Sequence, residues 1–253
     1  MISEKYPLDG DFIKIQASAH IEFELARVNS EPSVIIETEE WVHTRRLITV
    51  STRPNDCLDI KLVSGINYPA IKVYVSYRTP LVDLAIDGTS SMRSKNVLVS
   101  NPSSLLNIAH SGTGTIIFEF QHDSNINVAI LGTGQFILSG RVRGNGRLSV
   151  SGTPRLDALA CPMKIVTIEM SGTGLARVYG VEGVHITMSG VGTICYRGPL
   201  LGQITSGLGW ISECILEQTS EKPLHSSSKS DKIMDRNQRL MVILAITVFF
   251  LFF

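Results

Sequence analysis

The sequence predicts an all-β protein built as a parallel β-helix, or solenoid, with a short hydrophobic segment at its C-terminus. Three observations lead to this prediction. A Ser-Gly-Thr-Gly motif recurs at a fixed spacing, apolar residues alternate between its copies, and 21 glycines accompany only 7% aromatic residues. Such a composition is typical of a protein with many tight turns. A chain of 253 residues is also long enough to bury a sizeable core.

The repeated motif sets the length of the predicted coil. Four copies follow one another from Ser111 to Gly174 with their first glycines 20 residues apart, and two more follow at spacings of 18 and 17. A fixed period of this kind indicates stacked units, with glycine at the corners where the backbone needs positive φ or close approach. The predicted corner glycines are Gly112, Gly114, Gly132, Gly134, Gly152, Gly172, Gly174, Gly190, Gly192, Gly207 and Gly209.

Apolar residues between the glycines recur every second position, which is the period of a β-strand. Each repeat therefore reads as a strand, a glycine turn and a second strand. Equivalent apolar positions of successive coils should form ladders in a dry interior. One such ladder is Ile108, Val128, Leu148, Ile168 and Ile186, and Thr113, Thr133, Thr153 and Thr173 should line one corner. His110 falls in an apolar column, so we expect a packed core histidine.

The pattern divides the chain into five segments. They are a lead-in at 1–10, irregular first coils and a cap at 11–100, regular Gly-x-Gly coils at 101–216, a polar linker at 217–239 and a hydrophobic anchor or cleaved signal at 240–253. In the second segment, runs such as Ile21–Leu25 and Ile71–Val75 alternate like strands without the glycines. A separate small β-sandwich is the alternative for this segment. Trp210 is expected to cap the final coil from within the core.

The C-terminal segment favours membrane attachment. Leu240–Phe253 holds one polar residue, Thr247, but as a helix it would reach only about 21 Å, short of the ~30 Å hydrocarbon core. A cluster of small residues, Ser226, Ser227 and Ser228, precedes a polar spacer and this tail, which is the pattern of a GPI-attachment signal. A cytosol-facing tail anchor and a buried terminal helix are the alternatives. Residues 1–10 lack the apolar run of a secretory signal, which weighs against GPI attachment.

The chemistry-bearing residues show no catalytic or metal-binding pattern. Cys57, Cys161, Cys195 and Cys214 form no CxxC pair and stand at no zinc spacing, so we expect no metal and no cofactor. Packed free thiols are the favoured state, with a Cys195–Cys214 pair as the alternative.

Acidic and basic residues are balanced at 23 each, without a basic cluster on any segment, which excludes a typical nucleic-acid-binding protein. Four acidic residues fall at unrelated positions of the repeat, whereas a catalytic group of carboxylates would have to converge on one face. They are Asp83, Asp87, Asp123 and Asp157. Four arginines between 141 and 155 form a candidate surface for an anionic glycan.

The repeated Gly-Thr units resemble a known family. The stretch Ser189-Gly-Val-Gly-Thr-Ile-Cys-Tyr-Arg-Gly-Pro199, followed by Ser206-Gly-Leu-Gly209, is similar to the closing signature of the putative auto-transporter adhesin, head GIN domain family. The resemblance spans residues 10–215, with departures at Leu131, Pro154, Val191 and Leu208. It implies a right-handed parallel β-helix, an exported location and a role in surface adhesion, and it supplies no catalytic residues.

Together these observations predict a non-enzymatic cell-surface or membrane-anchored protein with a role in adhesion or envelope structure. The expected partners are a membrane through the tail, a glycan or protein on the solenoid face, and a second copy of the chain. The alternative is an intracellular, tail-anchored scaffold that self-associates. A polysaccharide-active enzyme is the third reading.

Overall fold

The computed structural model describes residues 1–214 except 9, 19, 54–55 and 100–103. Ser226, Ser227 and Ser228 lie outside these residues, as do the predicted linker at 217–239 and the hydrophobic segment at 240–253.

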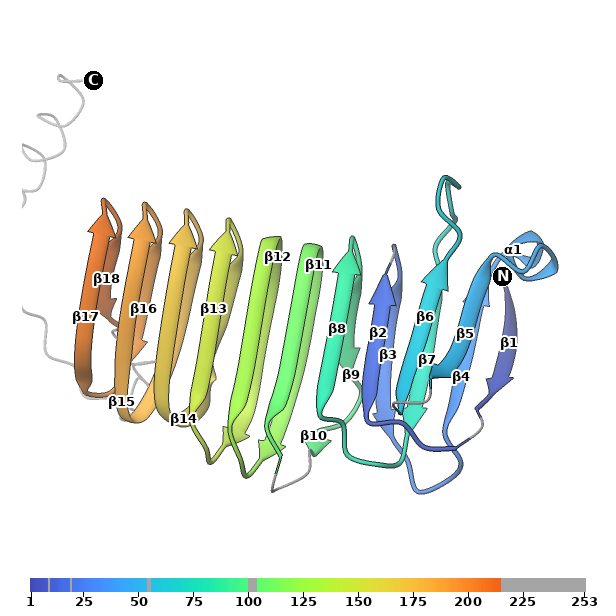
Figure 1. Ribbon diagram of the computed structural model, residues 1–253, viewed down its shortest axis with the longest axis horizontal. Helices are drawn as coiled ribbons and strands as arrows, with labels where there is room; N and C mark the ends of the chain where they lie inside the picture. The colour runs from blue at the N-terminus through green and yellow to red at the C-terminus, as the bar shows by residue number, and fades with distance from the viewer. Residues whose placement is uncertain (9, 19, 54–55, 100–103, 215–253) are drawn as a thin grey trace, which may run out of the picture. The chain divides into compact units, whose positions relative to one another are not determined.

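The predicted fold class is confirmed: the chain winds into a β-solenoid of about 6 turns with about 20 residues per coil. Each coil lies parallel to the next with equivalent residues in register, so that Ile108 stands beside Val128 (Figure 1). The coil strands are β11 (Leu106–His122), β12 (Ile126–Val142), β13 (Gly146–Gly152), β14 (Arg155–Gly172), β15 (Leu175–Gly190), β16 (Thr193–Arg197), β17 (Leu200–Gly207) and β18 (Trp210–Glu213).

The inward side chains form one continuous hydrophobic core. Ile108, Val128 and Leu148 are buried in one ladder, and Phe118 and Leu138 are buried in the facing one. This is the expected consequence of strand alternation repeated in register from coil to coil.

His110 is 2% exposed, which confirms the prediction of a core histidine. Its Nδ1 lies 2.9 Å from the carbonyl oxygen of Ile86, and its ring centroid lies 5.3 Å from that of Phe136. Both contacts tie the imidazole to the interior of the stack, where it packs like the apolar residues of its column.

The N-terminal coils are not stacked in chain order. Their elements are β1 (Ile2–Pro7), β2 (Lys14–Ser18), β3 (Glu22–Arg27), β4 (Ser33–Thr38), α1 (Glu40–Thr44), β5 (Ile48–Arg53), β6 (Cys57–Leu62), β7 (Lys72–Tyr77), β8 (Asp83–Gly88), β9 (Ser91–Ser94) and β10 (Leu98–Val99). Strand β2 pairs in parallel with both β6 and β8, and β3 with both β7 and β9. The coil made by β2 and β3 therefore lies between two later coils (Figure 1). Strands β8 and β9 then pair with β11 and continue the stack.

Antiparallel strands close the stack at its N-terminal end. Strand β4 pairs antiparallel with β7 and β1, and β5 pairs antiparallel with β6. Asp59 of β6 is buried there and accepts hydrogen bonds from Arg53 of β5 and forms an ion pair with Lys61. Burial opposes its ionisation, but hydrogen bonds from Lys61 and Arg53 outweigh burial and lower the pKa of Asp59. Antiparallel strands and an ion-paired aspartate therefore close this end of the stack.

The first glycines of the motif stack as a column with positive φ. They are Gly112, Gly132, Gly152, Gly172, Gly190 and Gly207. At Gly132, φ is 125°, and a Cβ atom would overlap the carbonyl oxygen of Gly112 in the preceding coil. The second glycine of the motif has no positive φ, yet a Cβ at Gly134 would lie 2.7 Å from the Gly114 oxygen. Both positions thus require glycine because neighbouring coils approach closely.

The first member of this column, Gly88, is not among the predicted corner glycines. Gly88 pairs with Gly112 and has a φ of 86°. The Gly-Thr pair at 88–89 is the signal that could have found it, but it precedes Gly112 by 24 residues, outside the 20-residue period. Thr113 and its equivalents Thr133, Thr153 and Thr173 are exposed along the same corner.

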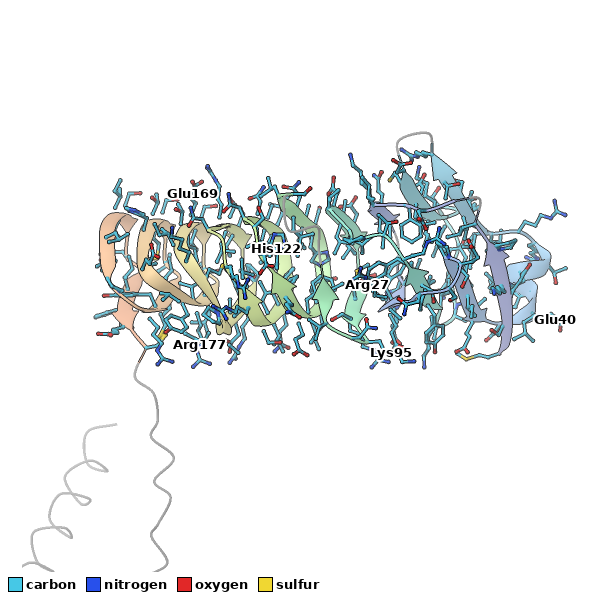
Figure 2. The ribbon with its side chains drawn as sticks, turned by 90° about the horizontal axis from the view of Figure 1, so that it is seen from below. Arg27, Glu40, Lys95, His122, Glu169 and Arg177 are labelled. Carbon is cyan, nitrogen blue, oxygen red and sulfur yellow. A yellow bond between two sulfur atoms is a disulfide. The ribbon has the colours of Figure 1, made fainter. Side chains whose placement is uncertain are left out.

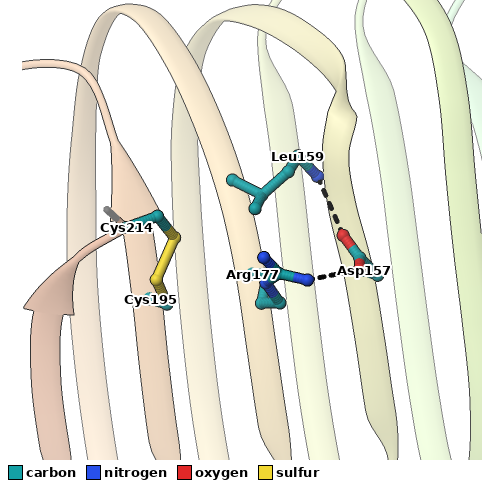
Figure 3. Close-up of a disulfide and its surroundings, with 5 residues drawn as sticks. All are labelled: Asp157, Leu159, Arg177, Cys195 and Cys214. Carbon is teal, nitrogen blue, oxygen red and sulfur yellow. Dashed lines mark hydrogen bonds and ion pairs between the residues drawn. A yellow bond between two sulfur atoms is a disulfide. The ribbon is translucent and has the colours of Figure 1, made fainter. Parts of the chain in front are cut away.

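The prediction of four free thiols is wrong for two of them. Cys195 of β16 and Cys214, directly after β18, form a disulfide with their Cα atoms 5.2 Å apart (Figure 3). Their separation of 19 residues is close to one coil, so stacking brings them side by side. Cys57 and Cys161 are free, and burial raises the pKa of the Cys161 thiol to about 12.

We predict that Gly132→Ala destabilises the protein far more than Gly65→Ala. Both glycines have positive φ, but only a Cβ at Gly132 meets another coil, while Gly65 has open space around it. The strained φ alone should cost about 1 kcal/mol, and the clash should raise the loss at Gly132 to at least about 3 kcal/mol. Urea unfolding measures both losses. Equal losses would contradict the close stacking of coils.

We predict that loss of the disulfide loosens the last coil selectively. In a Cys195→Ser, Cys214→Ser variant, hydrogen exchange at the amides of Trp210 and Cys214 should rise roughly 100-fold, the equivalent of about 3 kcal/mol. These amides donate to Gly192 and Tyr196 of the preceding coil. The amide of Thr153 in the middle of the stack, which donates to Gly132, is the control and should keep its protection. A uniform rise, or none, would contradict this role.

Candidate binding surface

Because the inward positions are filled by the core, ligand chemistry is confined to the outward rows of side chains. A groove of about 520 Å³ crosses the strands before the glycine corner. Its floor is made of small side chains, with Ala109, Ala129 and Ser149 in register on β11, β12 and β13. Short side chains in register leave this part of the sheet surface hollow.

A second row beside the floor carries hydroxyl groups. Its members are Asp87, Ser111, Leu131, Ser151, Ser171 and Ser189, one from each of six neighbouring strands. Ser171 donates a hydrogen bond to Ser151 over 3.1 Å. Each hydroxyl can both donate and accept, and equivalent groups repeat about every 4.8 Å along the stack. The row therefore offers regularly spaced polar contacts to an extended ligand.

The groove also contains carboxylates. Glu169 lies on its floor beyond Ser149 and accepts a hydrogen bond from Arg147 over 2.7 Å. Asp87 lies at its N-terminal end.

The acidic residues considered for catalysis are not brought together. Asp157 accepts hydrogen bonds from Arg177 over 3.0 Å and from the amide of Leu159, after the corner (Figure 3). Asp123 pairs with Arg143 over 3.2 Å. Asp83 begins strand β8. Among the residues that the structure describes, no three His, Cys, Asp or Glu side chains are grouped to hold a metal ion.

The four arginines between 141 and 155 are also dispersed. Arg147 is on the strand before the corner and is paired with Glu169, whereas Arg155 begins β14 after the corner. Arg143 is paired with Asp123 at the opposite turn. Figure 2 shows the two sides of the stack, with Glu169 and Arg177 on opposite faces. The anionic-glycan surface proposed from these residues is therefore not formed as one patch.

A smaller groove of about 330 Å³ lies over β3, β7 and β9. Two of its four charged residues, Glu24 and Arg93, are paired with each other. Glu24 accepts a hydrogen bond from Arg93 over 2.6 Å, and Tyr74 donates one to Glu37 over 3.0 Å. The bond to Glu37 raises the pKa of Tyr74.

The expected core position of Trp210 is wrong, because its side chain is 76% exposed. Trp210 pairs with Thr193, an outward position, whereas Ile211 stands beside the buried Ile194. Strand alternation therefore assigns the inward place in β18 to Ile211.

No helix among the described residues has the length and apolar character needed to cross a bilayer.

Comparison with known proteins identifies relatives of this fold. The family model described as "Putative auto-transporter adhesin, head GIN domain" matches residues 11–199. No curated protein matches the chain in sequence.

Three solved structures share the fold. A putative adhesin from Bacteroides fragilis superposes with a TM-score of 0.72 at 19% identity, covering 84% of this chain and 96% of its own. A putative adhesin from Parabacteroides distasonis gives 0.64 at 16% identity, covering 84% and 96%. One from Parabacteroides merdae gives 0.62 at 18% identity, covering 85% and 96%. Since the family model covers more than half of the chain, this protein belongs to the putative auto-transporter adhesin, head GIN domain family.

Proposed function

We propose that this chain is a non-enzymatic, membrane-anchored adhesin of the cell surface that binds an extended glycan or polypeptide along the groove over the serine row. The observation that carries the proposal is the regular spacing of that groove. The row repeats a serine at Ser111, Ser151, Ser171 and Ser189, in register from coil to coil and interrupted once by Leu131. A polymer lying across the coils can contact equivalent groups repeatedly, and such additive contacts suit adhesion.

The disulfide supports an exported location over the intracellular scaffold. Structural disulfides form and persist outside the reducing cytosol, and Cys195–Cys214 joins the last two coils. Anchorage through 240–253, with lipid attachment at Ser226, Ser227 or Ser228, follows from the pattern of the sequence alone. The alternative of a retained, cytosol-facing tail anchor makes the opposite prediction for the disulfide.

Groove binding is tested with cells that display the full chain, applied to surfaces coated with neutral, anionic or amino-bearing polysaccharides or with an extended polypeptide. Ala129→Trp fills the floor of the groove, and Gln135→Trp places the same side chain on an exposed position beyond the corner. We expect Ala129→Trp to reduce retention at least tenfold and Gln135→Trp to leave it unchanged. Equal retention of both variants, or no retention of the parent on any surface, would refute groove binding.

Anchorage has a separate test. Phosphatidylinositol-specific phospholipase C should release the protein from intact cells, and replacing Ser226, Ser227 and Ser228 together by leucine should abolish the releasable pool. Protein that stays in the membrane after phospholipase treatment and is shielded from protease added outside would establish the cytosol-facing tail anchor instead.

A further inference from the structure

The last coil of the stack leaves two strand edges open. Strand β17 pairs with β15, and β18 pairs with β16. Within the described residues, no strand pairs with the other edge of either. Each edge therefore presents N–H and C=O groups that can accept another strand.

The open edge lacks the usual protection against strand pairing. Strand β17 contains no Asp, Glu, Lys, Arg, His or Pro, and β18 carries a single charge, Glu213 at its end. Ile204 is 68% exposed and Leu208 is 83% exposed, beside the exposed Trp210. An extra residue, Leu201, interrupts the register near the start of β17, so the regular edge runs from Gly202 to Gly207. Natural edges are commonly blunted by charges or proline, and an uncharged, apolar edge is a pairing site.

The opposite end of the stack is protected. Its edge strand β1 carries Glu4 and Lys5 and ends at Pro7. Glu4 forms an ion pair with His43 over 2.7 Å. Antiparallel strands and helix α1 fold over that end (Figure 1). A head-to-tail contact would place the uncharged β17 against this charged edge, whereas two β17 strands meet without like charges.

We propose that two copies of this chain associate end to end through their last coils, with β17 of one copy antiparallel to β17 of the other. Such a contact is self-complementary and closes as a twofold dimer, not as a filament. The proposal is independent of the groove ligand and of the anchor.

The inward residues of β17 define how the two ends meet. Gln203 and Thr205 stand where Ile186 and Met188 stand one coil earlier, and Gln203 donates a hydrogen bond to Thr205 over 3.3 Å. On this side of the stack the inward apolar ladder thus ends at β15, whereas on the other side it continues from Ile194 to Ile211 of β18. The copies join through main-chain hydrogen bonds. Ile204, on the outward side of β17, packs against its counterpart in the second copy.

The test uses the full chain in a mild detergent, with its mass measured by analytical ultracentrifugation over a range of concentrations. We expect a dimer, and we expect Ile204→Lys to weaken dimerisation at least tenfold. Val63→Lys is the matched control, since Val63 is an exposed apolar residue far from β17 in the stack. Association through the hydrophobic tail would survive Ile204→Lys, and this result would overturn the proposal. A monomeric parent chain would also overturn the proposal. This is the result expected if another protein, or the chain itself, covers the edge.

Cross-linking gives a second readout that does not depend on a destabilising charge. Thr205→Cys, in a chain with Cys57→Ser, should give covalent dimers with a short bis-maleimide, because antiparallel β17 strands bring the two cysteines close. Thr133→Cys, exposed at a corner of the middle coils, should not. Equal cross-linking at both positions would overturn the proposal even if Ile204→Lys fails to fold.

Discussion

The close approach of backbones at the glycine corner is the constraint on which the rest of the structure depends. A Cβ atom at Gly132 or Gly172 would overlap the carbonyl of the coil before it. Without a side chain there, each coil can turn directly over its neighbour, and strand spacing of about 4.8 Å is kept around the bend. That spacing holds equivalent residues in register, which in turn makes ladders of the apolar residues inside and rows of the polar residues outside.

The sequence predicted the coils well because two periods coincide in it. Glycines repeat every 20 residues, and apolar residues such as Ile108 repeat every second position between them. The remaining features depend on which coil lies beside which. No local pattern indicates that β2 and β3 insert between later coils. The Cys195–Cys214 disulfide follows from the sequence once the spacing of the two cysteines is compared with the length of a coil. Strand alternation likewise places Trp210 outward, because its neighbour Ile211 stands beside the buried Ile194.

The candidate site was less predictable than the fold, because the groove forms where the outward side chains are short. Ala109, Ala129 and Ser149 carry no distinctive chemistry, and only their alignment produces a groove. Among the arginines that are conspicuous in the sequence, Arg147 and Arg155 lie on opposite sides of the corner. Arg147 is paired with Glu169 and Arg143 with Asp123. A regular solenoid spreads similar groups evenly along its faces, an arrangement suited to repeated weak contacts with a long partner. Catalysis requires dissimilar groups to converge at one point.

Distances between spin labels on the glycine corner test the stacking most directly. Thr113, Thr173 and Leu208 are exposed in one corner column, with Thr173 three coils and Leu208 five coils from Thr113. With Cys57 and Cys161 replaced, the account predicts Cα separations of about 14 Å from Thr113 to Thr173 and about 24 Å from Thr113 to Leu208, at about 4.8 Å per coil. Separations that do not grow in proportion to the number of coils would contradict it.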